Sequence, residues 1–185
     1  MVVCGIDEAG RGPIAGPVCA AAVILGSGFD RTQLKDSKAL SPAARNRIAA
    51  VLLRDAAVGV GWSWPEEIDR INIHHASLLA MQRAYEALAA SAPPEIAGKA
   101  LVDGKFTPPL PIAAEAIVKG DAKIPEISAA SIIAKVARDR WMIRYSWIEP
   151  NWAFETHKGY PTAAHRQLCR LHGLSPIHRR SFKIY

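Results

Sequence analysis

The chain has 185 residues and a mass of 20.0 kDa, a length that suits a single domain. Half of its residues are hydrophobic and 22% are charged, which excludes an intrinsically disordered chain. No apolar run reaches the roughly 18 residues that a membrane-spanning helix needs, and the N-terminus lacks the pattern of a secretory signal peptide. We therefore expect a cytoplasmic protein in which Cys4, Cys19 and Cys169 are buried free thiols.

The positive charge of the chain is concentrated in its C-terminal third. Residues 1–134 contain 13 Lys and Arg against 14 Asp and Glu, a net charge of −1. Residues 135–185 contain 10 against 3, a net charge of +7. A basic region beside a nearly neutral body indicates a surface for a polyanion such as a nucleic acid. A solvated basic face without a partner would have the same composition.

The predicted elements alternate between strands and helices along the chain. Short apolar runs predict strands at residues 2–6, 18–25, 58–64, 100–102 and 116–118. Helical spacing, capping residues and prolines predict helices at residues 42–54, 71–90, 125–147 and 162–172. Because no segment repeats, this alternation indicates one α/β domain over residues 1–185.

Four acidic residues follow predicted strands instead of lying beside bases on helices: Asp7, Glu8, Asp103 and Asp121. Strand ends form ligand sites in α/β folds, and acids that converge there repel each other unless a cation neutralises them. Oxygen ligands without a His or Cys cluster favour Mg²⁺ or Mn²⁺, and four carboxylates can hold the two ions of a phosphoryl-transfer site. Taken singly, each acid is more commonly the cap of a turn or a helix.

Ordered motifs along nearly the whole chain resemble those of the ribonuclease HII family. They are found at residues 5–13, 36–40, 101–104, 119–121, 128–135, 157–162 and 178–182. The resemblance implies an RNase H-like fold, with a mixed five-stranded sheet flanked by helices and a helical C-terminal region. It also implies hydrolysis of the phosphodiester on the 5′ side of a ribonucleotide, in RNA–DNA hybrids and at single ribonucleotides embedded in duplex DNA. The products would be a 3′-hydroxyl and a 5′-phosphate, and the reaction would begin ribonucleotide removal from DNA.

The same resemblance implies roles for individual residues. The catalytic, metal-binding acids of the family match Asp7, Glu8, Asp103 and Asp121, which would hold two Mg²⁺ or Mn²⁺ ions. The segment that reads the 2′-hydroxyl group of the ribonucleotide matches Gly10, Arg11 and Gly12. Tyr160 matches the tyrosine that packs against the sugar of the following deoxynucleotide.

Other charged residues have less specific predictions. Lys38 is expected to contact a DNA phosphate, from its motif alone. Asp139 is a candidate neighbour of the metal ions, and a surface ion pair with an arginine fits it equally well. Four basic residues of one predicted helix should divide between phosphate binding and solvated charge: Lys135, Arg138, Arg140 and Arg144. His157 and His165 lie near Tyr160 without the spacing of metal ligands.

Two other functions share part of this pattern. A catalytically silent nucleic-acid-binding module would explain the basic region but not the acids. A DNA recombination nuclease of the same superfamily would use the acids, but it would not need the loop at residues 10–12 or Tyr160. We expect a monomer that binds RNA–DNA hybrids and ribonucleotide-containing duplex DNA, to which the basic helical region 135–185 contributes. The sequence shows no clamp-binding peptide and no added N-terminal domain of the ribonuclease HIII kind.

Overall fold

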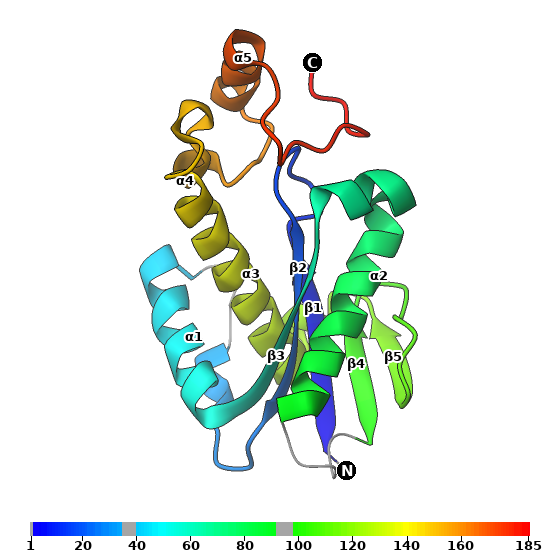
Figure 1. Cartoon of the computed structure of the whole chain (residues 1–185). Helices are drawn as coiled ribbons and strands as arrows, with labels where there is room; N and C mark the ends of the chain where they lie inside the picture. The colour runs from blue at the N-terminus through cyan, green and yellow to red at the C-terminus, as the bar shows by residue number, and fades with distance from the viewer. Residues whose placement is uncertain (1, 35–39, 92–97) are drawn as a thin grey trace.

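A mixed five-stranded sheet forms the centre of the protein (Figure 1). The computed structural model describes residues 2–34, 40–91 and 98–185. Its strands are β1 (Val3–Ala9), β2 (Val18–Leu25), β3 (Ala56–Ser63), β4 (Lys99–Asp103) and β5 (Ala113–Ile117), arranged in the order β3-β2-β1-β4-β5. β2 is antiparallel to β1 and β3, whereas β4 is parallel to β1 and β5. The predicted mixed five-stranded sheet is confirmed.

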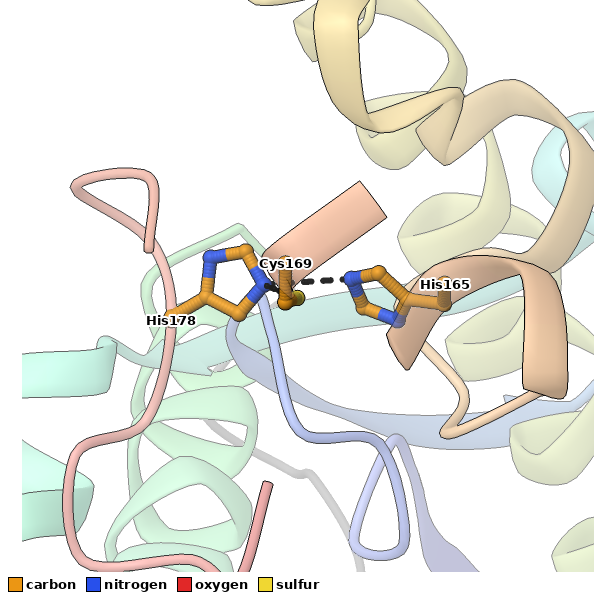
Figure 2. Close-up of side chains that lie close together, drawn as sticks. All are labelled: His165, Cys169 and His178. Carbon is orange, nitrogen blue, oxygen red and sulfur yellow. Dashed lines mark hydrogen bonds between the residues drawn. The ribbon is translucent and has the colours of Figure 1, made fainter. Parts of the chain in front are cut away.

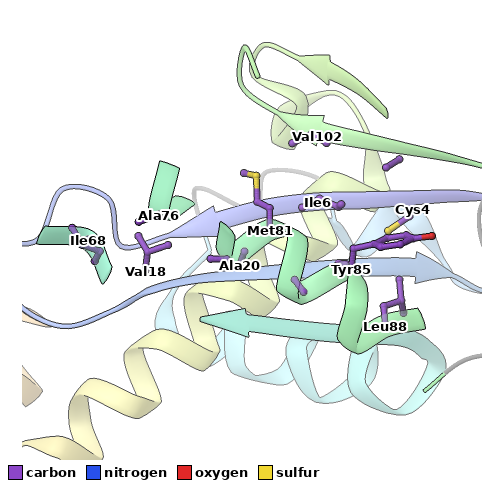
Figure 3. Packing of buried hydrophobic residues seen from close by; sticks show 14 residues of the cluster. Cys4, Ile6, Val18, Ala20, Ile68, Ala76, Met81, Tyr85, Leu88 and Val102 are labelled. Carbon is purple, nitrogen blue, oxygen red and sulfur yellow. The ribbon is translucent and has the colours of Figure 1, made fainter. Parts of the chain in front are cut away.

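Helices cover both faces of the sheet. α2 (Pro65–Ser91) packs on one face, where Met81, Tyr85 and Leu88 meet Ile6 and Val102 of the strands (Figure 3). α1 (Pro42–Asp55) and α3 (Pro125–Tyr145) pack on the opposite face around a second cluster of buried apolar residues. Removing these apolar surfaces from water is the main force that holds the three layers together.

Glycines allow both helical layers to approach the sheet backbone closely. A Cβ atom at Gly5 of β1 would lie 2.1 Å from the carbonyl carbon of Glu126 in α3. A Cβ atom at Gly59 of β3 would lie 2.2 Å from the carbonyl oxygen of Ala84 in α2. The backbones of strand and helix therefore touch at both places, and no larger residue fits there without moving one of them.

Three of the predicted elements have the largest boundary errors. β1 continues through Asp7 and Glu8 to Ala9, because these residues extend the antiparallel ladder with β2. β5 runs from residue 113 to 117, and not from 116 to 118. The helix predicted from residue 71 begins at Pro65 and is kinked at Asn72, whose φ is 65°.

A helical C-terminal region packs against the end of α3 (Figure 1). It contains the 3-10 turn η4 (Pro150–Trp152), α4 (Phe154–His157) and α5 (Ala163–His172). Trp152, Phe154 and Cys169 form a third buried cluster there with Met142 of α3. The three cysteines of the chain are buried and free, as predicted. Among the described helices, none combines the length and apolar character needed to cross a lipid bilayer.

Candidate active site

Three adjacent strands bring the four predicted acids to one end of the sheet. Asp7 and Glu8 belong to β1, Asp103 is the last residue of β4, and Asp121 lies in the 3-10 turn η3 (Gly120–Ala122) after β5. Asp103 Oδ1 accepts hydrogen bonds from the backbone N–H groups of Gly120, at 2.7 Å, and Asp121, at 3.5 Å. The parallel pairing of β1 with β4 places Asp7 beside Asp103, so the acids gather although they are distant in sequence.

The acids of this site repel one another in a buried environment. Burial raises the pKa of Asp7 well above its usual range, and the charges of Glu8 and Asp103 raise it further. Burial also raises the pKa of Glu8; Arg11, whose Nη1 lies 3.2 Å from Glu8 Oε1, acts in the opposite direction. A divalent cation would relieve this repulsion, and a donor set made of carboxylate oxygens suits a hard ion. The residues present therefore fit Mg²⁺ or Mn²⁺.

A cleft beside these acids brings together the residues predicted to bind substrate. Its lining includes Glu8, Gly10, Arg11, Gly12, Lys135 and Tyr160. A Cβ atom at Gly12 would lie 3.7 Å from the Tyr160 ring, and Lys135 Nζ lies 5.6 Å from the centroid of that ring. Tyr160 is 40% exposed, so its ring is accessible to a molecule in the cleft. Of the four acids, Glu8 lines this cleft directly, so it connects the acid cluster to the cleft that contains Tyr160.

The comparison with known proteins agrees with this arrangement. A model of the family described as "Ribonuclease HII" matches residues 4–185. The chain belongs to the ribonuclease HII family. It is 49% identical to the ribonuclease HII of Treponema denticola, over 98% of both chains, and 53% identical to that of a Marinomonas species, over 98% of this chain and 89% of the relative. A chain of the solved PCNA:RNase HII complex from Archaeoglobus fulgidus is 25% identical, with a TM-score of 0.79 over 100% of this chain and 96% of that one.

Membership of the ribonuclease HII family confirms the predicted enzyme class. The chain is a type HII ribonuclease H, a phosphodiester hydrolase with activity on RNA–DNA substrates. The prediction of an RNase H-like fold is confirmed as well, because the solved relative superimposes over the whole chain. Family membership therefore favours an enzyme over a nucleic-acid-binding module without catalytic activity.

The structure separates the remaining charged residues, for which the predictions from sequence were less specific. Lys38 lies outside the described residues. Asp139 forms an ion pair with Lys135, at 2.8 Å, so within the part of the chain that the structure describes its ion-pair partner is a lysine and not the predicted arginine. The prediction for Arg138 is wrong, because its side chain is fully buried and can neither be solvated nor reach a phosphate. Arg140 and Arg144 are exposed, and Arg140 donates a hydrogen bond to the Asn46 side chain at 3.0 Å.

Two polar residues that line the cleft were not predicted individually. Ser131 of α3 lines the cleft, and its side chain forms a hydrogen bond that lowers the pKa of Asp7 against the larger effect of burial. It lies within the motif at residues 128–135, so the signal was present in the sequence. Arg45 of α1 also lines the cleft. Nothing local distinguishes it from other helix arginines, because only the packing of α1 beside α3 brings it there.

Three side chains of metal-ligand type meet in the C-terminal region (Figure 2). His165 and Cys169 come from α5, and His178 follows it. His178 Nε2 lies 3.1 Å from His165 Nε2 and 3.1 Å from Cys169 Sγ. All three residues are buried. By ligand type alone such a set suits Zn²⁺. Which imidazole nitrogens carry protons decides between a metal site and a hydrogen-bonded network.

Neighbouring hydrogen bonds fix the tautomers of both histidines. The Ser175 backbone N–H donates to His178 Nδ1 at 2.9 Å, so neutral His178 carries its proton on Nε2. His165 Nδ1 faces the Tyr160 carbonyl oxygen at 2.9 Å and must donate to it, which leaves His165 Nε2 as the acceptor for His178. His178 therefore directs a proton, and not a lone pair, into the cluster. The cluster is a hydrogen-bonded network that anchors the backbone at Tyr160.

This network should make the free energy of unfolding depend on pH. Burial lowers the pKa of His165 and of His178 to about 4, whereas an unfolded histidine titrates near pH 6.5. As the pH falls from about 6.5 to 4, the unfolded chain binds more protons, so stability decreases by up to about 1.4 kcal/mol per pH unit for each histidine. The free energy of unfolding can be measured by urea unfolding at about pH 7, 6 and 5. We expect it to decrease less steeply with falling pH in His178→Gln than in the wild type. The exposed His172→Gln variant should keep the wild-type slope. Equal slopes in all three proteins would contradict this account.

Proposed function

We propose that this ribonuclease HII cleaves the phosphodiester on the 5′ side of a ribonucleotide, leaving a 3′-hydroxyl and a 5′-phosphate. Its substrates are RNA–DNA hybrids and duplex DNA that contains a single ribonucleotide, so it begins the removal of ribonucleotides from DNA. The observation that carries the proposal is the position of the acids of β1, β4 and η3 beside a cleft lined by residues 10–12 and Tyr160. The same place thus offers ligands for cations and a surface for a sugar.

The four acids are proposed as the ligands of Mg²⁺ or Mn²⁺: Asp7, Glu8, Asp103 and Asp121. Ions held there would make a water molecule more nucleophilic and would neutralise charge on the scissile phosphate. The chain itself keeps the acids in place, because two of them lie within a strand and Asp103 accepts hydrogen bonds from the backbone of η3. The Ser131 hydrogen bond to Asp7 favours its ionised form, which is the form that binds a cation.

The cleft is proposed to recognise the junction between a ribonucleotide and a deoxyribonucleotide. Only the 2′-hydroxyl distinguishes the two sugars at a given position, so recognition requires a contact with it. Gly10 and Gly12 have no side chain, so their backbone groups can reach a sugar directly. The exposed Tyr160 ring lies beside Gly12 in the cleft and can pack against the next sugar. The basic region 135–185 contributes phosphate contacts, and we propose that one chain acts alone as a single catalytic domain.

A duplex with one ribonucleotide at a known position tests this function. We expect a single nick on the 5′ side of that ribonucleotide in Mg²⁺ or Mn²⁺, and no nick when a chelator is added. The new 3′ end should be extended by a DNA polymerase, because it carries a free hydroxyl. A duplex of the same sequence without the ribonucleotide is the control and should remain intact.

Each alternative gives a different outcome in this assay. Cleavage of the all-DNA duplex at the same rate would favour a DNA recombination nuclease. No cleavage with or without chelator would favour a module that only binds nucleic acid. A nick on the 3′ side of the ribonucleotide would contradict the proposed position of the acids relative to the cleft.

A further inference from the structure

Two fully buried arginines lie beneath the loop of residues 10–16, which forms most of the connection from β1 to β2. Arg138 comes from α3, and Arg179 comes from the segment after α5. A guanidinium group can be buried only when its N–H groups find acceptors. Here the acceptors are backbone carbonyl oxygens, and most of them belong to this loop. Both arginines therefore act on the segment that lines the cleft.

Arg179 binds four carbonyl groups of the loop at once. Its Nη2 donates to Gly10 at 2.6 Å and its Nη1 to Pro13 at 2.7 Å and Arg11 at 3.0 Å. Its Nε donates to Gly16 at 2.9 Å. Three of the seven loop residues are glycines, so the free loop has many accessible conformations. A planar guanidinium has fixed donor directions, and four simultaneous hydrogen bonds to it select one of these conformations.

Arg138 connects the same loop to the Tyr160 side of the cleft. Its Nη2 donates to the Ala15 carbonyl oxygen at 3.1 Å, and its Nη1 donates to the Lys158 carbonyl oxygen at 2.9 Å. The backbone of Gly10 rests on this side chain, because a Cβ atom there would lie 2.1 Å from Arg138 Nε. The two arginines thus hydrogen-bond both the loop and the backbone two residues before Tyr160.

We propose that Arg179 is a positioning residue for ribonucleotide recognition, which holds residues 10–12 in the conformation that contacts the 2′-hydroxyl group. The inference rests on the proposed function, since it concerns how the proposed cleft selects its substrate. Arg179 does not itself reach the cleft; it acts through the backbone carbonyl groups that it binds.

Backbone hydrogen bonds hold the segment that carries Arg179 in place, independently of the Arg179 guanidinium group. The Arg179 backbone N–H donates to the Ile14 carbonyl oxygen at 2.9 Å, and the Gly16 N–H donates to that of Ile177 at 2.8 Å. Asp69 of α2 accepts hydrogen bonds from the backbone N–H groups of Arg180 and Ser181, both at 2.9 Å. Changing the Arg179 side chain should therefore alter the loop more than the fold.

The test compares Arg179→Lys with Arg54→Lys, a change at an exposed arginine of α1 that lies outside the basic region 135–185 and outside the cleft lining. Lysine keeps the positive charge, but its single nitrogen cannot span four carbonyl groups. We expect Arg179→Lys to raise KM for a duplex with one ribonucleotide by about tenfold and to change kcat less. Affinity for the all-DNA duplex of the same sequence should stay within about twofold of the wild type, because phosphate contacts dominate it. Arg54→Lys should behave like the wild type in both measurements.

The outcomes separate this inference from the proposed function. If the wild type does not prefer the ribonucleotide duplex, the proposed function fails, and the inference fails with it. If the wild type prefers that duplex and Arg179→Lys keeps the same preference, only the inference is overturned. Equal losses of affinity for both duplexes would also overturn it, since they indicate a general defect. Arg138→Lys is the second variant; if neither variant unfolds cooperatively, the arginines are structural and the inference is wrong.

Discussion

Asp7→Asn should reduce single-turnover cleavage of a ribonucleotide-containing duplex by at least about a thousandfold, equivalent to about 4 kcal/mol in the activation barrier. The amide has nearly the same shape as the carboxylate, but it lacks the negative charge and one of the oxygen ligands that the proposed cations need. Binding of an RNA–DNA hybrid should remain within about threefold of the wild type, because most of the binding free energy comes from phosphate contacts. The measurements are cleavage rates and binding curves with the same labelled duplex.

The thermal stability of this variant separates a catalytic effect from misfolding. Asp7 is 5% exposed, and burial, together with the charges of Glu8 and Asp103, raises its pKa. Replacing it with a neutral side chain removes that repulsion, so the metal-free variant should melt at the same or a higher temperature. Asp55→Asn, which changes an exposed carboxylate paired with Arg54, is the control and should leave cleavage unchanged. Wild-type turnover by Asp7→Asn would remove Asp7 from the catalytic site.

Gly59→Ala should lower the free energy of unfolding by about 3 kcal/mol. The added methyl group would lie 2.2 Å from the Ala84 carbonyl oxygen and 2.3 Å from the Leu88 backbone nitrogen. Neither atom can rotate away, because both belong to the backbone of α2, so β3 and α2 must separate. Urea unfolding monitored by tryptophan fluorescence measures the loss.

Gly28→Ala is the matched control for this stability prediction. No atom lies within 4 Å of the position that its Cβ would occupy. Its free energy of unfolding should therefore stay within about 1 kcal/mol of the wild type. If Gly59→Ala is as stable as Gly28→Ala, the close approach of α2 to β3 at Gly59 does not contribute to the stability of the fold.

Strand and helix boundaries were hardest to predict where polar residues continue an element. The apolar run that predicted the first strand stops at Ile6, but backbone pairing with β2 carries Asp7 and Glu8 within the strand. The start of α2 was missed because its first turn carries Glu66 and Glu67 instead of a hydrophobic stripe. Glu67 accepts a hydrogen bond from the Trp64 backbone N–H at 2.9 Å, a capping signal that the sequence does contain.

Burial of charge could not be predicted from the spacing of basic residues along a helix. Arg138 and Arg140 are two positions apart in α3, yet one is fully buried and the other exposed. The difference depends on which carbonyl groups of distant segments meet each side chain, here those of Ala15, Pro17 and Lys158. The candidate acids were more accessible to prediction, because each stands in or near an apolar strand and the sheet order then brings those strands together.

The contact between Gly5 and Glu126 has a consequence for how tolerant the site is of change. β1 holds Asp7 and Glu8, and α3 holds Ser131. Because main chain meets main chain at Gly5, no intervening layer can be compressed, swollen or rearranged when core residues elsewhere are replaced. The offset between strand and helix is thus set by atoms that every amino acid shares. The distance between the acids of β1 and Ser131 of α3 should therefore change little when the surrounding hydrophobic residues are replaced, as long as residue 5 remains a glycine.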